Sequence, residues 1–266
     1  MNVSKRIPGI SHVWGLLSRA QTVYQERGFL PLLRIGYQFT SHWLWVARLT
    51  VLYLVRYGKA APMPNERTQI DPAEIEYGMN KFSYGEVPPF GVLPGSWDQK
   101  KVHRFEHGEM WKGLLERYGD GKPWEETSYY QTGIERLRDG ETLRVLDAED
   151  HTIEEFEAYM AHLDEMYETM KNDGYDQSSV VPVSIDRDGE WVLYADGNHR
   201  TTLAQGAGIE SIPVSIVYRH QRWQDIRYEV SRADEYEELS EEAKRHLSHP
   251  DLQSLVQSKW QITDKS

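Results

Sequence analysis

The sequence predicts an α+β domain, because short apolar strands and amphipathic helices alternate in its second half. Three segments are apolar and rich in β-branched or aromatic side chains, which favours strands: residues 180–185, 191–194 and 212–218. After the second of these, Asp196-Gly197 breaks the strand, since glycine accepts backbone angles that other residues resist. Residues 199–207 then have the composition of a short helix, with Gly208 as its expected end.

A long helix is predicted immediately before these strands. Thr152 and Glu155 have the spacing of a capping box, which marks a helix start, and Gly174 is the expected end. Apolar residues recur every three or four positions on one face of this helix: Ile153, Phe156, Tyr159, Met160, Leu163, Tyr167 and Met170. The pattern also predicts helices at 102–118 and 133–138, and an ordered loop rich in glycine, proline and aromatic residues at 82–98.

The composition is that of a soluble globular protein. The 266 residues are 39% hydrophobic and 27% charged, and the chain is long enough to bury a core. It contains no cysteine, which excludes disulfides, thiolate zinc sites and cysteine nucleophiles. The amino terminus lacks the apolar run and small-residue cleavage site of a secretory signal, so we expect a cytoplasmic protein.

The charge is distributed unevenly along the chain. Residues 1–60 contain eight Lys or Arg and one acid, a net charge of +7, which leaves −19 for the remainder of a chain whose total is −12. Phosphate neutralisation by basic side chains supplies most nonspecific affinity for nucleic acid. The acidic body therefore makes a nucleic acid an unlikely partner.

Residues 10–57 have the pattern of helical segments, with Pro31 expected to divide them. Residues 43–55 are the most apolar stretch, but they number only thirteen and include Arg48, whereas a spanning helix needs about 20 residues. Tryptophan, tyrosine and flanking arginine are typical of a helix in a membrane interface, so peripheral association with an anionic membrane surface is one prediction. The other is a helix packed on the main domain or on a second copy of the chain, as in a homodimer.

The predicted organisation has three parts. Residues 1–60 form a basic, aromatic-rich helical segment, and Gly58–Pro64 has the composition of a linker. Residues 65–220 form the main domain, with an insertion at about 80–145. Residues 221–266 are an acidic helical extension in which no helix-turn-helix spacing is evident.

The order of predicted elements, together with Asp196-Gly-Asn-His-Arg200 and Gly208-Ile-Glu-Ser-Ile-Pro-Val214, resembles the ParB/sulfiredoxin superfamily. Thr68–Ile75 is similar to the first strand and turn of that fold. The resemblance implies a small mixed sheet with helices around it. It also implies a Gly-x-x-Arg loop that holds nucleotide phosphates, as ParB proteins do with CTP, sulfiredoxins with ATP and archaeal free serine kinases with ADP. The form with Asp-Gly before x-His-Arg is closest to that of the kinases.

This sequence departs from the superfamily in two respects. Sulfiredoxin activity needs a cysteine, which is absent here, and the acidic tail does not resemble the helix-turn-helix region of ParB proteins. The residues before 67 and the insertion have no counterpart that we can assign.

Seven consecutive residues are the predicted phosphate-binding site: Asp196, Gly197, Asn198, His199, Arg200, Thr201 and Thr202. A helix start carries unpaired N–H groups and partial positive charge, and arginine suits bidentate phosphate contacts. Each side chain also has a structural alternative. Asp196 could cap the turn, His199 could bond to a carbonyl, and Arg200 could pair with one of the many acids.

Phosphoryl transfer needs a base for the acceptor and usually a divalent ion. The superfamily topology places carboxylates near the first strand, so the predicted catalytic residues are Glu76, ahead of Glu74 and Asp98. His103 and His107, with Glu106 between them, have helical i, i+4 spacing that could hold a metal, but no third ligand is evident. The metal ligands stay undetermined.

The function predicted from these observations is nucleotide binding coupled to phosphoryl transfer. In this hypothesis the protein is a kinase that uses ATP, ADP or CTP, with Mg²⁺, on a small hydroxyl-bearing acceptor. The first alternative is a nonenzymatic, nucleotide-gated interaction module at a membrane surface. The second, a DNA-binding or nuclease protein of ParB type, conflicts with the charge of the body.

Overall fold

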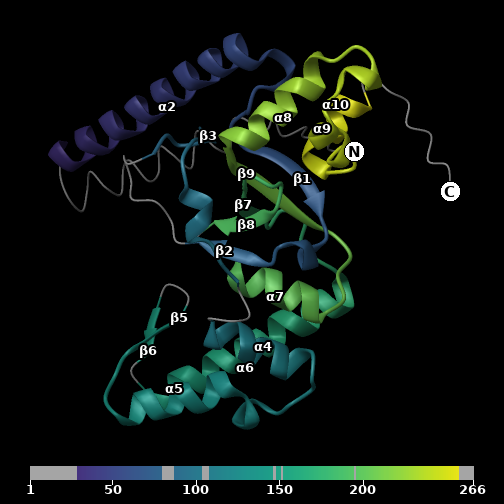
Figure 1. Ribbon diagram of the computed structural model, residues 1–266. Helices are drawn as coiled ribbons and strands as arrows, with labels where there is room; N and C mark the ends of the chain where they lie inside the picture. Colours follow the sequence, from purple (N-terminus) through teal and green to yellow (C-terminus); the bar gives the residue numbers. More distant parts are fainter. Residues whose placement is uncertain are drawn as a thin grey trace, which may run out of the picture. The chain divides into compact units, whose positions relative to one another are not determined.

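The computed structural model describes residues 29–79, 87–103, 108–145, 148–150, 152–194 and 196–257 (Figure 1). The chain divides into two compact units, Met1–Leu52 and Tyr53–Ser266. The boundary falls within α2 (Phe29–Tyr57), a helix of 29 residues. The second unit contains the mixed α+β fold that the sequence predicted.

One mixed sheet forms the centre of the second unit. Its seven described strands are β1 (Glu66–Ile70), β2 (Tyr77–Met79), β3 (Gly91–Leu93), β4 (Val102–His103), β7 (Val181–Ile185), β8 (Trp191–Tyr194) and β9 (Ile212–His220). The order is β1-β9-β7-β8-β2-β4, and β3 pairs with the end of β9. β7 runs parallel to β9 and antiparallel to β8, while β2 runs parallel to β8. All four residues of β8 are buried, which explains its continuous apolar sequence.

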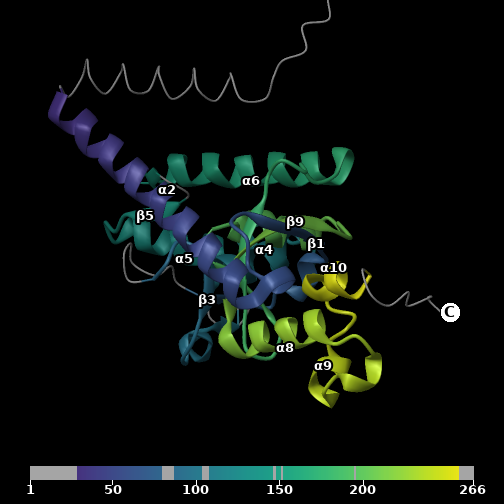
Figure 2. The same ribbon diagram turned by 90° about the horizontal axis from the view of Figure 1, so that it is seen from above.

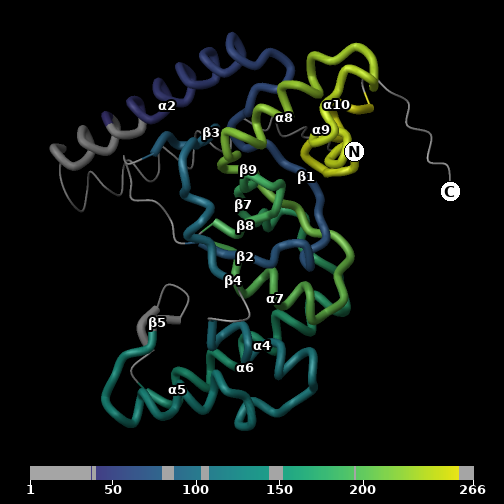
Figure 3. The backbone as a smooth tube through the Cα atoms, viewed as in Figure 1, coloured from purple at the N-terminus to yellow at the C-terminus, as the bar shows by residue number. Residues whose placement is uncertain are grey.

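Four helices share a core on one side of the sheet: α4 (Glu109–Tyr118), α5 (Ser128–Arg138), α6 (Ile153–Asp173) and α7 (Asn198–Gly206). Leu114, Phe156, Leu163 and Leu203 are completely buried in this core. The hairpin of β5 (Leu143–Val145) and β6 (Ala148–Asp150) belongs to the same connection. In Figure 3 the backbone passes from β4 through α4, α5 and α6 before it returns to the sheet.

Local sequence signals explain the bounds of α6. Thr152 accepts a hydrogen bond from the Glu155 amide, and the Glu155 carboxylate accepts one from the Thr152 amide, so the predicted capping box is confirmed. Gly174 ends the helix with a φ of 82°, which glycine adopts readily.

Three helices cover the other side of the sheet: α8 (Gln221–Arg232), α9 (Glu241–Arg245) and α10 (Gln253–Val256). Figures 1 and 2 show α8 and α6 on opposite sides of the strands. Trp223 and Val230 of α8 are fully buried in one core with the sheet residues Val181 and Val183. The helical character predicted for residues 221–266 is thus confirmed as far as residue 256, and these helices complete the main core.

A buried ionic network connects this carboxy-terminal segment to the sheet. The Asp251 carboxylate accepts hydrogen bonds from Arg219 of β9, at 2.8 Å from Nε, and from the Trp223 indole at 2.9 Å. The Arg227 guanidinium donates to the Asp251 carbonyl at 3.0 Å and to the Glu66 carboxylate at 2.7 Å. Burial alone would raise the pKa of Asp251, but the two arginines hold it well below its usual range.

Short 3₁₀ helices connect the larger elements: η1 (Gly58–Ala60), η2 (Pro72–Glu74), η3 (Trp97–Lys100), η4 (Trp124–Glu126), η5 (Tyr236–Glu238) and η6 (Pro250–Leu252). Two of them refine the sequence predictions. η2 lies within Thr68–Ile75, the segment expected to form a strand and a turn, and η3 confirms an ordered segment at the end of the glycine- and proline-rich loop.

Helix α2 begins at Phe29, close to the division predicted at Pro31, and Pro31 lies in its first turn, where a missing N–H costs nothing. One prediction of helix bounds was wrong. Residues 102–103 are strand rather than helix, because Val102 pairs with Gly78 at the sheet edge, and α4 begins only at Glu109. The helical prediction for residues 10–28 lies outside the described residues.

Among the helices that the structure describes, none has the length and apolar character needed to cross a membrane.

Candidate functional site

The start of α7 and the segment that leads into β7 meet at one edge of the sheet. β7 and β8 are antiparallel, with Val183 opposite Leu193, so the start of β7 and the end of β8 lie at the same edge. Residues 174–180 lead into β7 at this edge, and α7 begins at the same edge after the end of β8. Two segments that are separate in sequence therefore form one surface.

A glycine with a left-handed backbone leads into α7. Gly197 has a φ of 94°, and its amide donates to the Asp196 carboxylate at 2.6 Å. The Thr201 amide donates to the Gly197 carbonyl at 2.9 Å, which closes the first helical turn. The amides at the start of a helix have no carbonyl one turn earlier within it, so the amides of Asn198, His199 and Arg200 have no hydrogen-bond partner within α7.

Gly197 is required by the fold itself. A Cβ atom at this position would lie 2.8 Å from Cγ1 of Val181 in β7, and the left-handed backbone adds a further penalty for other residues. The close approach that Gly197 permits is therefore to a neighbouring strand.

Arg200 connects the two segments of the site. Its Nη1 donates to the Ser179 hydroxyl at 2.9 Å and to the Val180 carbonyl at 3.3 Å. Its Nη2 lies 3.4 Å from the carboxylate of Asp196, whose side chain is 79% exposed. Burial raises the pKa of the nearby Tyr175 hydroxyl, and Arg200 partly opposes this effect. One side of the guanidinium is thus anchored by neutral oxygens, while the other has a long contact with an exposed carboxylate.

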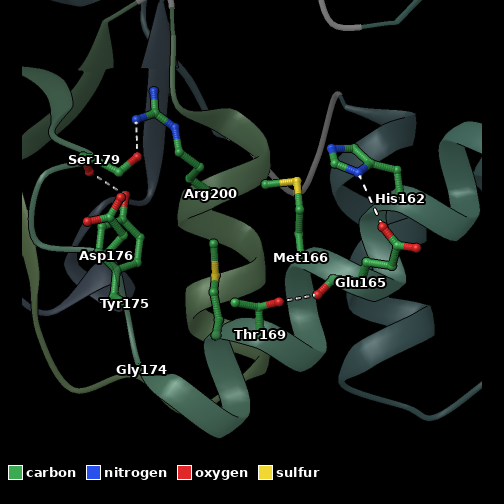
Figure 4. Close-up of a pocket in the computed structure, with 10 residues that line it drawn as sticks. His162, Glu165, Met166, Thr169, Gly174, Tyr175, Asp176, Ser179 and Arg200 are labelled. Carbon is green, nitrogen blue, oxygen red and sulfur yellow. Dashed lines mark hydrogen bonds and ion pairs between the residues drawn. The ribbon is translucent and has the colours of Figure 1, made fainter.

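A cavity of about 320 Å³ adjoins Arg200. It is lined by α6, the segment before β7 and Arg200 of α7: His162, Glu165, Met166, Thr169, Met170, Gly174, Tyr175, Asp176, Ser179 and Arg200. Figure 4 shows Arg200 and Ser179 at one end, and His162 and Glu165 at the other, with Met166 between them. The cavity therefore combines an apolar wall with a cation at one end.

His199 faces the protein interior. Its Nε2 forms a hydrogen bond with the Tyr159 hydroxyl of α6, and burial lowers the pKa of the imidazole to about 4. It is therefore neutral at physiological pH and joins α6 to α7. The prediction that His199 supplies a side-chain donor to phosphate is not supported by this geometry.

Two other predicted donors are also in the core. Thr201 and Thr202 have side chains that are 0% and 1% exposed, and the Thr201 hydroxyl donates to the Gly197 carbonyl at 2.8 Å. Their hydroxyls do not reach the loop surface. Of the seven predicted residues, Asp196, Asn198 and Arg200 remain as side chains on that surface.

The carboxylate of Asp98, a predicted base, is already engaged in hydrogen bonds. It accepts two hydrogen bonds of 2.6 Å from the Arg187 guanidinium and one of 3.3 Å from the Arg187 amide. Burial would raise the pKa of Asp98, but these bonds hold it below its usual value. Arg187 follows the end of β7, whereas α7 begins beside the start of β7. The Asp98–Arg187 pair therefore lies at the other end of these strands from the start of α7.

Glu74 and Glu76 are not brought to the loop either. Glu74 accepts a hydrogen bond of 3.0 Å from the indole of Trp191, which begins β8. Glu76 directly precedes β2, which runs parallel to β8, and is exposed at that same end. α7 follows the other end of β8, and four strand residues separate the two ends by roughly 10 Å. A base must lie within about 3 Å of the proton it takes, so the tertiary structure argues against these two roles.

Metal ligands are equally unsupported. The described residues contain no group of three or more His, Asp or Glu side chains that could hold a metal ion. Glu106 and His107 lie outside the described residues, and His103 belongs to strand β4 rather than to the predicted helix.

The sequence interpretation missed the contribution of α6 and of the loop before β7. Ser179, Tyr175 and Met170 belong to segments interpreted only as a helix face and its end. One signal was available. Asp176 and Ser178 form a side-chain turn, with the Ser178 amide donating to the Asp176 carboxylate at 2.9 Å, directly before a buried strand.

Comparisons with protein-family models, curated proteins and solved structures find no match to this chain.

Proposed function

We propose that this protein binds a nucleotide, with the phosphates at the start of α7 and beside Arg200. The observation that carries the proposal is the difference between the contacts of the two terminal nitrogens of Arg200. Ser179 and Val180 hold Nη1, whereas Nη2 lies 3.4 Å from the exposed Asp196 carboxylate. Exposed ion pairs contribute about 0–1 kcal/mol, so a phosphate could replace Asp196 at little cost.

The helix start supplies the second attraction for a phosphate. Its N–H groups and its partial positive charge favour an anion, and Arg200 adds a formal charge in the same turn. The segment before β7 positions Arg200 from the other side. These features together suit a phosphate ester better than a neutral ligand.

The adjoining cavity supports a nucleoside as the other part of the ligand. Its volume of about 320 Å³ is near the lower end of the ~300–1,000 Å³ typical of ligand pockets, which suits a base and sugar with the phosphates outside. Met166, Met170 and Tyr175 supply apolar contacts of the kind that flat rings use. The resemblance of the Asp196–Arg200 sequence to the ParB/sulfiredoxin superfamily agrees with this ligand class.

Phosphoryl transfer onto a small hydroxyl-bearing acceptor is a second candidate function. The observation in its favour is Asp196, an exposed carboxylate at the phosphate end of the site. It replaces Glu74, Glu76 and Asp98 as the proposed base. Mg²⁺ would then arrive with the nucleotide phosphates. Without turnover, the protein is a nucleotide-gated interaction module.

The proposal is tested by calorimetric titration of the full chain with ATP, ADP and CTP, each with and without Mg²⁺. Arg200→Ala should weaken binding about 10- to 150-fold, because a charge-assisted contact contributes roughly 1.5–3 kcal/mol. Asn198→Asp should also weaken binding, since a carboxylate at the helix start repels phosphate, while it leaves the helix as stable or slightly more stable. Arg222→Ala, which removes an exposed arginine from α8, is the matched control. Unchanged affinity in a folded Arg200→Ala protein would show that the nucleotide site lies elsewhere.

Asp196→Asn separates the two candidate functions. It removes the carboxylate that competes for Arg200, so nucleotide affinity should stay equal or increase. If Asp196 is the base, turnover should fall about 10²- to 10⁴-fold. Nucleotide binding without product formation in the wild type would leave the interaction module as the function.

A further inference from the structure

Helix α2 has an exposed apolar face that the nucleotide site does not explain. Tyr37, Leu44, Val51 and Val55 are 75%, 66%, 59% and 82% exposed. Successive residues of an α-helix are rotated by about 100°, so these four side chains lie within about 40° of one another. They form a stripe about 27 Å long at about 1.5 Å per residue. Three more exposed apolar side chains flank this stripe: Trp43, Leu52 and Leu54.

The last residues of α2, which belong to the second unit, use the opposite face for packing. Tyr57 is buried, and the Tyr53 hydroxyl accepts a hydrogen bond from the Val92 amide at 3.2 Å. Tyr57 is also joined to α8, because its hydroxyl accepts a hydrogen bond from Gln221 at 3.2 Å. The exposed apolar stripe therefore lies on a different face of α2 from these contacts.

The charges of α2 indicate the kind of surface that would cover the stripe. The helix contains no Asp or Glu, whereas the whole chain has a net charge of −12. Arg48 and Arg56 are exposed, and Arg48 lies about 40° from Leu44 on the helical wheel. Apolar side chains flanked only by cations are typical of a helix that lies in the interface of an anionic bilayer.

A second copy of the chain fits this face less well. Pairing two α2 helices would bring cations together without any acid to compensate. Docking α2 on the acidic body of another copy would need an apolar patch there. Outside α2, the exposed large hydrophobic residues of the described chain are three scattered side chains: Met63, Val102 and Tyr236.

We propose that α2 binds an anionic lipid surface, lying parallel to it with the stripe of Tyr37, Leu44, Val51 and Val55 in the interface. Interfacial helices bury their apolar face by about 5–10 Å, and the arginines would contact lipid headgroups. The same arrangement leaves the contacts of Tyr53 and Tyr57 in place. This inference is independent of the nucleotide proposal, since the two use different residues.

Vesicle cosedimentation of the full chain tests the proposal. The vesicles contain phosphatidylcholine alone or an equal mixture with phosphatidylglycerol. We expect at least tenfold more bound protein with the anionic vesicles, and a clear decrease when salt is raised from about 0.1 to 1 M, because the screening length falls from about 10 to 3 Å. Leu44→Gln/Val51→Gln/Val55→Gln should lose at least tenfold of this binding.

The control variant removes the same number of exposed apolar side chains elsewhere: Met63→Gln/Val102→Gln/Tyr236→Gln. It should bind vesicles as the wild type does. If the α2 variant unfolds, judged by circular dichroism, Arg48→Gln/Arg56→Gln provides the second test and should lower binding to anionic vesicles.

Three outcomes would overturn the proposal. Equal sedimentation with both kinds of vesicle would exclude recognition of anionic lipid. A monomer that stays in the supernatant with both would exclude lipid binding altogether. A dimer that ignores vesicles, and that the α2 variant converts to a monomer, would assign the stripe to a second copy of the chain.

Discussion

Acid should destabilise this protein well before its carboxylates are protonated, because two histidines are buried in their neutral form. Burial lowers the pKa of His199 and of His249 to about 4, from an ordinary value of 6.5. His249 is stacked on Trp191, with ring centroids 4.8 Å apart, and its Nε2 is 3.0 Å from the Gly189 carbonyl. The carboxylates of Asp196 and Asp251 favour the charged imidazoles, but they offset the effect of burial only in part.

The sign of the effect follows from these values. Between pH 6.5 and 4 the unfolded chain binds protons that the folded chain does not, so stability is complete above about pH 6.5 and falls as the pH is lowered. At pH 4.5 the expected loss is about 2.5 kcal/mol for each histidine and about 5 kcal/mol for the pair. Typical domains have only about 5–15 kcal/mol of stability. Asp98 and Asp251, whose pKa values are held below the ordinary 3.8, add to the loss mainly below about pH 4.

Urea unfolding at pH 7 and pH 4.5, followed by circular dichroism, measures this difference. His199→Gln and His249→Gln should each lower the pH-dependent loss by about half, whatever their stability at pH 7. His162→Gln, which removes an imidazole that is 52% exposed, is the control and should keep the wild-type difference. If both buried variants keep the full difference of about 5 kcal/mol, the two histidines are not the source of acid sensitivity.

Two further substitutions test the fold around the site. Asp251→Asn should lower the free energy of unfolding by about 3–5 kcal/mol, because it removes the fully buried carboxylate from Arg219 and Arg227 and leaves Glu66 as their remaining acid; a urea-derived loss below about 1 kcal/mol would contradict the buried network. Gly197→Ala should cost about 2–4 kcal/mol through its left-handed backbone and its clash with Val181. Gly208→Ala is the matched control, because Gly208 has a φ of 69° and an added methyl group would meet no atom within 4 Å, and it should cost only about 1 kcal/mol. Equal losses in the two glycine variants would remove the packing argument for Gly197.

The elements that the sequence predicted well depend on interactions between near neighbours. The capping box at Thr152 and Glu155 and the left-handed glycines at 174 and 197 act within one helical turn, so their residues suffice to predict them. Strand β8 begins and ends at the predicted residues, because its apolar sequence is bounded by turn residues on both sides.

The functional predictions depended on which ends of the strands lie at the same edge of the sheet. Local sequence patterns do not contain this information. Glu74, Glu76 and Asp98 were assigned to the phosphate loop by analogy of order, but the register of β2, β7 and β8 places them away from it. The same register brings Ser179 to Arg200, although 21 residues separate them.

The sequence alone therefore determined the α+β class, the position of α6, the turn at Gly197 and the candidate loop that follows it. Only the tertiary structure decided which residues of that loop face outward. His199, Thr201 and Thr202 turn into the core because α7 packs against α6 and the sheet, whereas Arg200 emerges beside the cavity. The physical reason is that turns and caps are set by contacts a few residues apart. The direction of each side chain is set instead by packing between segments distant in the chain.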